Sequence, residues 1–315
     1  MKKETWYKKY TCQELCKYHT DQFTKWWDPD LFDWKDYAWC LAEYCAEYFD
    51  VWWDPDKYDW VNGSQVLTEN YSMYFDKWWD PEKFDWENNS DILAENCSDY
   101  FDVWWDAEKY NWEDSCVLAQ YCTNYFNIWW DAKKFNWEDS WALAQYCTNY
   151  FNIWWDAEKF DWKHDSNILA ENCSDCFDVW WDPEKFDWKH DSDILAENYS
   201  DQFTKWWNPD LFDWRDSWAL AQYCSKYFDI WWDAEKYNWN SSWLLAQYCT
   251  NYFNIWWDAE KFNWVFGKDD LNKYCSSKFT DLQLKQLLLH QNKYARQFAM
   301  KELQRRKNDK RGMVE

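Results

Sequence analysis

The chain has 315 residues and contains 35 Trp, 23 Tyr and 20 Phe, but only 3 Gly and 5 Pro. This shortage of glycine excludes the glycine-rich phosphate loops of dinucleotide- and nucleotide-binding proteins, and it argues against a β-rich fold with many tight turns. The net charge of −24 combines −30 over residues 1–264 with +6 over residues 265–315. An acidic body of this kind is not expected to bind nucleic acid and should attract basic partners.

Residues 1–25 are predicted to form an N-terminal cap and a degenerate repeat. Residues 20–27, TDQFTKWW, nearly repeat residues 200–207, SDQFTKWW. The opening residues are charged and lack the apolar stretch of a signal peptide. No apolar run approaches the ~18 residues of a membrane span. The sequence therefore predicts an intracellular, cytoplasmic protein with reduced cysteines and no membrane span.

Residues 26–264 are predicted to be tandem Trp-rich helical repeats, because a Trp-Trp pair recurs every 25 or 26 residues. The pairs begin at Trp26, Trp52, Trp78, Trp104, Trp129, Trp154, Trp180, Trp206, Trp231 and Trp256. The one-residue difference lies between the third Trp of a unit and the next Leu, and we interpret that place as an exposed loop. With degenerate outer copies, the second of them at residues 265–283, about eleven units are expected.

One unit, residues 137–162, reads WEDSWALAQYCTNYFNIWWDAEKFDW and carries three helix-start signals. These signals are Asp139-Ser140, Thr148 and Asp156, and Pro follows the third in five units. The unit fits either one helix of about 16 residues plus a short one, or two short helices plus a 3₁₀-like turn. We favour the second pattern because Ser or Thr recurs at the place of Thr148. The fold class predicted is all-α, an α-solenoid of about eleven repeats of 25–26 residues with a C-terminal capping helix.

The short unit, with its LAQYC or LAENC phrase followed by a capped second helix, resembles the leucine-rich repeat variant class of solenoid. The resemblance implies alternating α and 3₁₀ helices and concerns the architecture only. That family has Asn-Pro and Val-Arg where this chain has Cys-Thr and Trp-Trp-Asp.

Residues 284–315 are predicted to be a basic amphipathic capping helix and tail. Residues 282–307, LQLKQLLLHQNKYARQFAMKELQRRK, have the pattern of one continuous amphipathic helix whose first half covers the end of the array. The last ten or so residues are expected to be a solvated tail. Because this end is basic, RNA, a membrane surface or the acidic body of another copy are its candidate partners, and self-association through the helix is one expectation.

The cysteines and histidines do not suggest a catalytic or metal site. Eight cysteines share one unit position: Cys45, Cys97, Cys122, Cys147, Cys173, Cys224, Cys249 and Cys275. Other units have Tyr71, Tyr199 or His19 there, so a small buried side chain is favoured over a metal ligand. The spacings Cys12–Cys16–His19 and Cys173–Cys176 are weak zinc signals in a chain with 13 Cys. No catalytic triad recurs, and we predict no catalytic residue, no cofactor, no metal and no enzymatic activity.

The candidate partner-binding residues are tryptophans and the acids beside them. Adjacent helical residues point about 100° apart, so one Trp of each pair should face the core and the other a neighbouring unit or a groove. The adjacent acid is the expected acceptor for an indole N–H, and it can cap a helix or belong to a binding face. The candidates are Trp141, Trp155, Asp156, Trp181, Asp182, Trp207, Trp218, Trp232, Asp233 and Trp243.

The sequence therefore favours a non-enzymatic repeat scaffold that binds a protein partner, expected to be basic, through charge and cation–π contacts on an acidic, aromatic-rich surface. Two alternatives stay open. Rows of exposed Trp could bind glycans or small ligands. The acidic body could instead mimic a nucleic acid and block a basic site on another protein.

Overall fold

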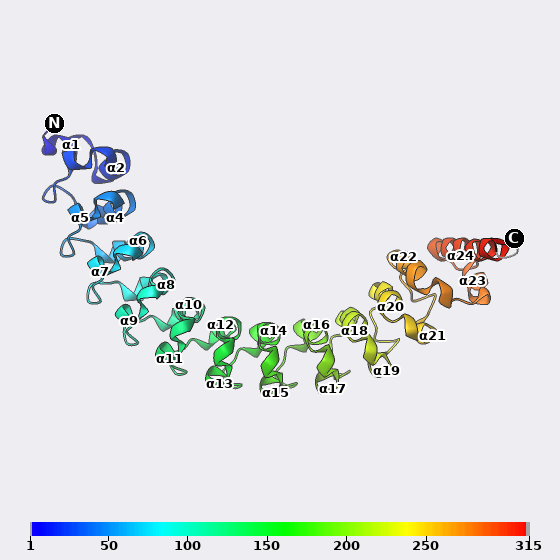
Figure 1. Cartoon of the computed structure of the whole chain (residues 1–315). Helices are drawn as coiled ribbons and strands as arrows, with labels where there is room; N and C mark the ends of the chain where they lie inside the picture. The colour runs from blue at the N-terminus through cyan, green and yellow to red at the C-terminus, as the bar shows by residue number, and fades with distance from the viewer. Residues whose placement is uncertain (1, 313–315) are drawn as a thin grey trace. The chain divides into compact units, whose positions relative to one another are not determined.

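The computed structural model describes residues 2–312 and divides them between two compact units, Met1–Asp161 and Trp162–Glu315. Helices build both units, and residues 2–312 contain no strand. Successive first helices of the repeats pack on each other inside each unit, α4 on α6 and α14 on α16 for example. The predicted all-α architecture of tandem helical repeats with a period of 25–26 residues is confirmed (Figure 1).

Each repeat consists of a first helix, a 3₁₀ turn and a short helix. In one copy these are α12 (Ser140–Tyr146), the 3₁₀ turn Thr148–Tyr150 and α13 (Phe151–Trp154). The favoured prediction was two short helices plus a 3₁₀-like turn, and the structure contains these parts, with the 3₁₀ turn lying between the two helices. Thr148 is the first residue of the 3₁₀ turn, and no side chain caps this turn with a hydrogen bond. The predicted capping role of Thr148 is therefore wrong.

First helices and short helices form two rows in each unit, visible side by side in Figure 1. In unit Met1–Asp161 the first helices are α4 (Trp34–Tyr44), α6 (Trp60–Asn70), α8 (Trp86–Asn96), α10 (Ser115–Tyr121) and α12. Its short helices are α3 (Phe23–Trp26), α5 (Phe49–Trp52), α7 (Phe75–Trp78), α9 (Phe101–Trp104), α11 (Phe126–Trp129) and α13.

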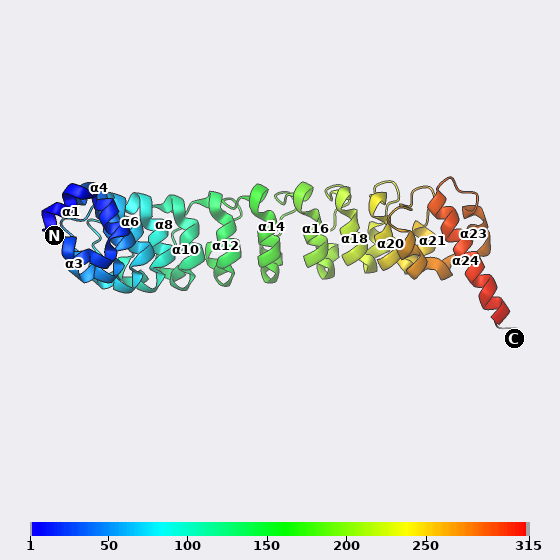
Figure 2. The same cartoon turned by 90° about the horizontal axis from the view of Figure 1, so that it is seen from above.

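In unit Trp162–Glu315 the same two rows recur, and Figure 2 shows the first helices α14, α16 and α18 side by side. The first helices are α14 (Trp162–Asn172), α16 (Trp188–Asn198), α18 (Ser217–Tyr223) and α20 (Ser242–Tyr248). The short helices are α15 (Phe177–Trp180), α17 (Phe203–Trp206), α19 (Phe228–Trp231) and α21 (Phe253–Trp256).

The one-residue difference between repeats lies inside the first helix, so its interpretation as an exposed loop is wrong. Repeats of one kind begin with eleven α-helical residues, as in α8, whereas the others begin with a three-residue 3₁₀ turn, such as Trp112–Asp114, followed by seven α-helical residues. A 3₁₀ turn rises about 2.0 Å per residue and an α-helix about 1.5 Å, so both versions span about 16.5 Å. The shorter repeat thus keeps the same length by winding its first turn more tightly.

The first Trp of each pair forms the core of its repeat. All ten of these side chains are at most 1% exposed, and their indole N–H groups donate to a backbone carbonyl seven residues earlier, at 2.9 Å for Trp129 and Cys122. The third Trp of a unit donates to a carbonyl five residues earlier, as Trp137 does to Ala132. The predicted acceptor, the Asp or Asn side chain just before the third Trp, is therefore wrong at that position.

Two polar ladders hold consecutive repeats together in the interior. The serine ladder consists of fully buried hydroxyls that accept a backbone N–H of the next repeat, as Ser115 does from Asn136 at 2.9 Å. The cysteine ladder donates S–H to a carbonyl of the preceding repeat, as Cys122 does to Ala94 at 3.7 Å. The serine ladder comprises Ser64, Ser90, Ser115 and Ser140 in the first unit and Ser166, Ser192, Ser217 and Ser242 in the second.

The two ends of the chain depart from the repeat. At the start, α1 (Lys3–Lys9) and α2 (Cys12–Tyr18) precede the first short helix, and Thr11 and Glu14 cap α2 reciprocally. At the other end lie α22 (Lys268–Asp270), a π-helical turn Leu271–Cys275 and a 3₁₀ turn Ser276–Lys278, followed by α23 (Asp281–Leu287) and α24 (Lys293–Gly312).

The predicted continuous helix over residues 282–307 is wrong, because the chain breaks between α23 and α24. Asn292 accepts the backbone N–H of Tyr294 at 2.9 Å, and His290 accepts that of Asn292 at 3.0 Å. These side chains satisfy backbone donors at the start of α24 and so separate it from α23. Helix α24 continues to Gly312, so the predicted solvated tail is helical as far as the described residues reach.

Two of the three glycines are needed for space. A Cβ atom on Gly63 would lie 2.3 Å from the Tyr58 hydroxyl oxygen, and one on Gly267 would lie 2.6 Å from the Phe262 ring. Tyr58 uses the space to donate its hydroxyl to the carbonyl of Gly63 at 3.0 Å.

Candidate binding surface

The second Trp of each pair is the partly accessible member. Trp130 and its counterparts from Trp53 to Trp257 are half-buried, whereas Trp27 is 7% exposed. Each stacks on the Phe that begins its short helix, as Trp207 does on Phe203 at 5.2 Å, and meets the third Trp of the repeat edge-on. The predicted division of the pair, one Trp in the core and one elsewhere, is thus observed.

The candidate tryptophans of the pairs, Trp155, Trp181, Trp207 and Trp232, all hold this half-buried position after a short helix. Within residues 2–309, where side chains are described, no acceptor contacts the indole N–H of Trp181, Trp207 or Trp232. These three donors are therefore free to hydrogen-bond with a partner.

The candidate acids beside these tryptophans act as turn caps. The Oδ1 atom of Asp182 accepts the backbone N–H of Glu184 at 2.9 Å, and Asp233 does the same for Glu235 at 2.9 Å. Asp156 makes the equivalent bond to Glu158 at 3.0 Å. One carboxylate oxygen of each acid is thus used locally, which explains why Asp or Asn always follows the pair.

The other candidates, Trp141, Trp218 and Trp243, lie in the first helices α12, α18 and α20, not in the turns that hold the Trp pairs. Trp218 meets Tyr223 edge-on at 6.4 Å. Next to it, burial and the nearby carboxylates of Asp193 and Asp213 raise the pKa of Asp216 to about 6. The candidates therefore come from two different rows of elements.

All eight cysteines of the ladder are buried, and burial raises the pKa of seven of their thiols. Cys97, Cys122, Cys147, Cys173, Cys224, Cys249 and Cys275 reach about 12. The exchange of Cys for Tyr has a simple geometric basis, because Tyr71 and Tyr199 also donate to a carbonyl of the preceding repeat, at 2.8 and 2.6 Å. Over the described residues, no three His, Cys, Asp or Glu side chains converge in a way that could hold a metal ion.

A lysine ladder runs along the turns, and the sequence interpretation missed it. Lys109 donates to the carbonyl of Pro81 at 3.0 Å and pairs with Glu82 of the preceding repeat at 2.6 Å. Lys134 repeats both contacts with Ala107 and Glu108. The signal was the Lys that recurs three residues after the Asp of the Trp-Trp-Asp phrase.

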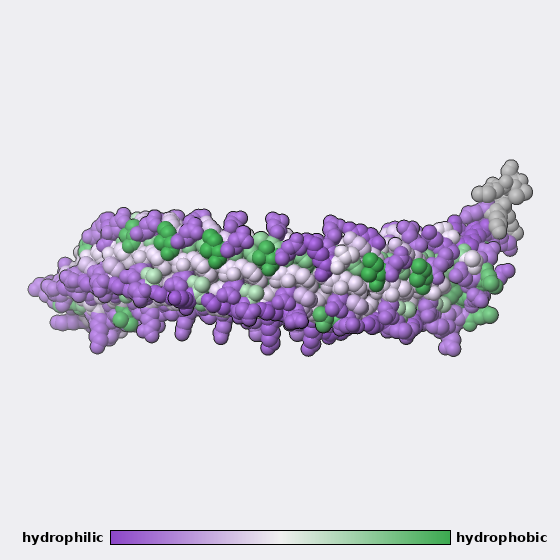
Figure 3. Space-filling model, turned by 90° about the horizontal axis from the view of Figure 1, so that it is seen from below, coloured by the Kyte–Doolittle hydropathy of each residue, from purple (hydrophilic) through white to green (hydrophobic). Residues whose placement is uncertain are grey.

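An exposed apolar row, also missed, lies along the short helices. It consists of the third residue of each short helix, 56–59% exposed where this residue is Val or Ile. We call it the short-helix row: Val51, Val103, Ile128 and Ile153 in the first unit, and Val179, Ile230 and Ile255 in the second. Figure 3 shows hydrophobic residues recurring along this face, bordered by hydrophilic ones. The remaining short helices have Lys25, Lys77 or Lys205 at this place.

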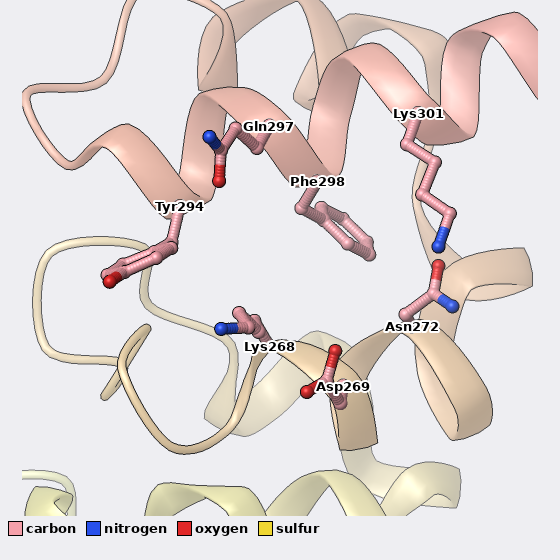
Figure 4. Close-up of a pocket in the computed structure, with 7 residues that line it drawn as sticks. All are labelled: Lys268, Asp269, Asn272, Tyr294, Gln297, Phe298 and Lys301. Carbon is pink, nitrogen blue, oxygen red and sulfur yellow. The ribbon is translucent and has the colours of Figure 1, made fainter.

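A small cleft of about 210 Å³ lies between α22 and α24 (Figure 4). Lys268 and Lys301 border it, Asp269 points into it, and Phe298 forms part of its wall. The Lys268 ammonium lies 4.5 Å from the centroid of the Tyr294 ring. Charges of both signs thus border this small space.

Comparison of the chain with family models, with curated proteins and with solved structures gave no match. Within the described part of the chain, no helix is both long and apolar enough to cross a membrane.

Proposed function

We propose that the chain is a non-enzymatic repeat scaffold that binds a basic protein partner through its acidic, aromatic-rich surface. The observation that carries this proposal is the excess of acidic over basic residues in the body of the chain. Residues 1–264 contain 52 acidic and only 22 basic residues, and the lysine ladder engages several of these bases inside the chain. Most acids of the body therefore have no cation of their own.

The ladder shows how little of this negative charge is hidden. Glu82 and Glu108 each pair with a ladder lysine, and their side chains are still 82% and 86% exposed. Asp210 is 89% exposed and Asp201 91%. Such carboxylates attract a basic protein over roughly a Debye length, about 8 Å at physiological ionic strength. The half-buried tryptophans and tyrosines nearby add rings over which an ammonium or guanidinium group can lie.

The test is a binding titration with purified full-length chain. A fluorescently labelled Lys-rich peptide and a matched Glu-rich peptide are each titrated at low and at physiological salt, and fluorescence anisotropy is measured. We expect binding of the Lys-rich peptide only, weakening steeply as salt rises. Absence of Lys-rich binding at low salt would overturn the proposal.

The same preparation separates the alternatives. Binding on a glycan array accompanied by a shift of Trp fluorescence would point to a glycan site. Displacement of DNA from a basic DNA-binding domain, with no binding to Lys-rich peptides that lack such a fold, would point to a nucleic-acid mimic.

A further inference from the structure

Lysines of the chain itself occupy some places of the short-helix row, and their contacts show how an ammonium group can bind there. Lys77 stands in the row, and its Nζ lies 2.5 Å from Asp50 of the preceding repeat and 5.1 Å from the centroid of the Tyr74 ring. Lys205, in the second unit, pairs with Asp178 at 2.6 Å in the same way. A lysine stem in place of the aliphatic residue thus brings its charge to an acid of the repeat before.

We call this pair of groups a lysine seat: the acid that is second in one short helix, and the Tyr just before the next short helix. Two consecutive seats in the first unit are open, Asp76 with Tyr100 and Asp102 with Tyr125. Asp76 and Asp102 are exposed, and no cation among the described residues of that unit pairs with either. In the second unit Asp229 with Tyr252 forms one open seat.

An aliphatic residue stands beside each open seat, where the closed seat has its lysine. Val103 follows the first seat and is 59% exposed, and Ile128 follows the second and is 57% exposed. The stem of an incoming lysine has four methylene groups that can lie on such a side chain while the ammonium reaches the acid. A row of exposed aliphatic residues between acids therefore suits a lysine better than a purely apolar partner.

The spacing of the repeats restricts the conformation of the partner. Packed helices lie about 8–10 Å apart, so two consecutive seats should be separated by about that distance. A polyproline II segment has three residues per turn and rises about 3.1 Å per residue, so every third side chain faces the same way about 9 Å further on. A helix brings side chains back to the same face about 5–6 Å further on or, seven residues on, about 10.5 Å further on, so polyproline II reaches consecutive seats with fewer intervening residues.

We propose that α7, α9 and α11 form a docking site for an extended lysine-rich segment of a partner protein, with lysines three residues apart in the two open seats. This site rests on the proposed function and gives it a location and a ligand pattern. Asp76 and Asp102 bind the ammonium groups, Tyr100 and Tyr125 lie under them, and Val103 and Ile128 contact the stems.

The experiment uses a peptide of Lys-Pro-Pro repeats and full-length chain. The double variant Asp76→Asn/Asp102→Asn removes both seats, and we expect it to bind this peptide about tenfold more weakly. The matched control Glu82→Gln/Glu108→Gln loses the same two charges from the turns, where lysines already pair with them, and should bind within about twofold of the unchanged chain. A peptide of the same composition with all lysines adjacent should bind the unchanged chain and the Glu82→Gln/Glu108→Gln control less tightly than the repeating peptide does.

A second variant blocks a seat by adding a lysine and leaves the acid of the seat unchanged. In Val103→Lys the new side chain should pair with Asp76 as Lys77 pairs with Asp50, and so block the first seat and weaken binding about fivefold. Circular dichroism verifies that each variant stays helical. If the unchanged chain binds no Lys-rich peptide, the proposed function fails. If it binds but the seat and control variants lose affinity equally, only this site fails.

Discussion

Ile153 and Trp154 are neighbours in one short helix, yet they follow opposite rules. Ile153 is 56% exposed, whereas Trp154 is 1% exposed and donates its N–H to the carbonyl of Cys147. The Trp place is occupied by Trp in all ten pairs, but the Ile place holds Val, Ile or Lys. The interior fixes each residue because volume and hydrogen bonds must both fit. The surface row accepts aliphatic and basic side chains alike, because this place is exposed and no close packing selects among them.

The largest expected effect is on the pH dependence of stability, to which a buried ladder thiol should contribute and an exposed side chain of the short-helix row should not. Burial raises the pKa of ladder thiols such as Cys122 from 9.0 to about 12. Between these values the unfolded chain releases protons that the folded chain keeps, so the free energy of unfolding falls as pH rises, by about 1.4 kcal/mol per pH unit for each thiol. Below pH 9 this contribution to stability is fully present.

This is measured by urea unfolding from pH 8 to pH 12, followed by circular dichroism. Cys122→Ala should reduce the slope between pH 9 and 12, whereas Ile128→Ala should leave it unchanged. An identical slope in all three chains would show that the ladder thiols do not contribute.

The second effect tests neighbouring residues of α11. Trp129→Ala removes a fully buried indole and its hydrogen bond to Cys122, and it should cost about 3–5 kcal/mol. Ile128→Ala changes an exposed side chain and should stay within about 0.5 kcal/mol. Urea unfolding at pH 7 gives both values. Similar losses in the two variants would mean that the row packs against something.

The third effect concerns the space beside Tyr58. Gly63→Ala places a methyl group against the Tyr58 ring, and overpacking of this kind should cost about 1–3 kcal/mol. Val61→Ala, at a 70% exposed site in the same helix, is the control. Adding Tyr58→Phe should recover part of the loss, because the next repeat combines Phe84 with Asn89 at these places. Full stability of Gly63→Ala in a thermal melt would refute the steric argument.

The smallest effect concerns the lysine ladder. Lys109→Gln breaks the exposed pair with Glu82 and the bond to the Pro81 carbonyl, and it should cost about 1 kcal/mol or less. Because the pair is exposed, high salt should shrink the difference between the two chains. A loss as large as that of Trp129→Ala would place the ladder among the interior contacts.

Much of the fold could be predicted from the sequence because each structural repeat corresponds to one sequence repeat. The Trp pairs give the period, and Asp or Pro after them gives the start of each turn. The sequence misled us where two backbone conformations have equal length, as at Trp112–Asp114, where a missing residue changes the type of helix and forms no loop. It also misled us at His290 and Asn292, whose side chains cap a helix inside an amphipathic pattern.

The candidate site, too, could be predicted from the sequence only in part. Half-buried tryptophans such as Trp207 could be proposed from the pairs, because two adjacent helical residues cannot share one direction. The lysine seats could not, since Asp50 and Lys77 are 27 residues apart and meet only when repeats stack.

The sequence by itself determined the period, the helical content and the acidic surface, because these depend on residues close together in the chain. Only the tertiary structure decided which Trp of each pair is buried, which carbonyl each thiol faces, and which acids remain without a cation. Those outcomes depend on contacts between repeats. The same side chain can be paired or unpaired, depending on which residue of the next repeat lies beside it.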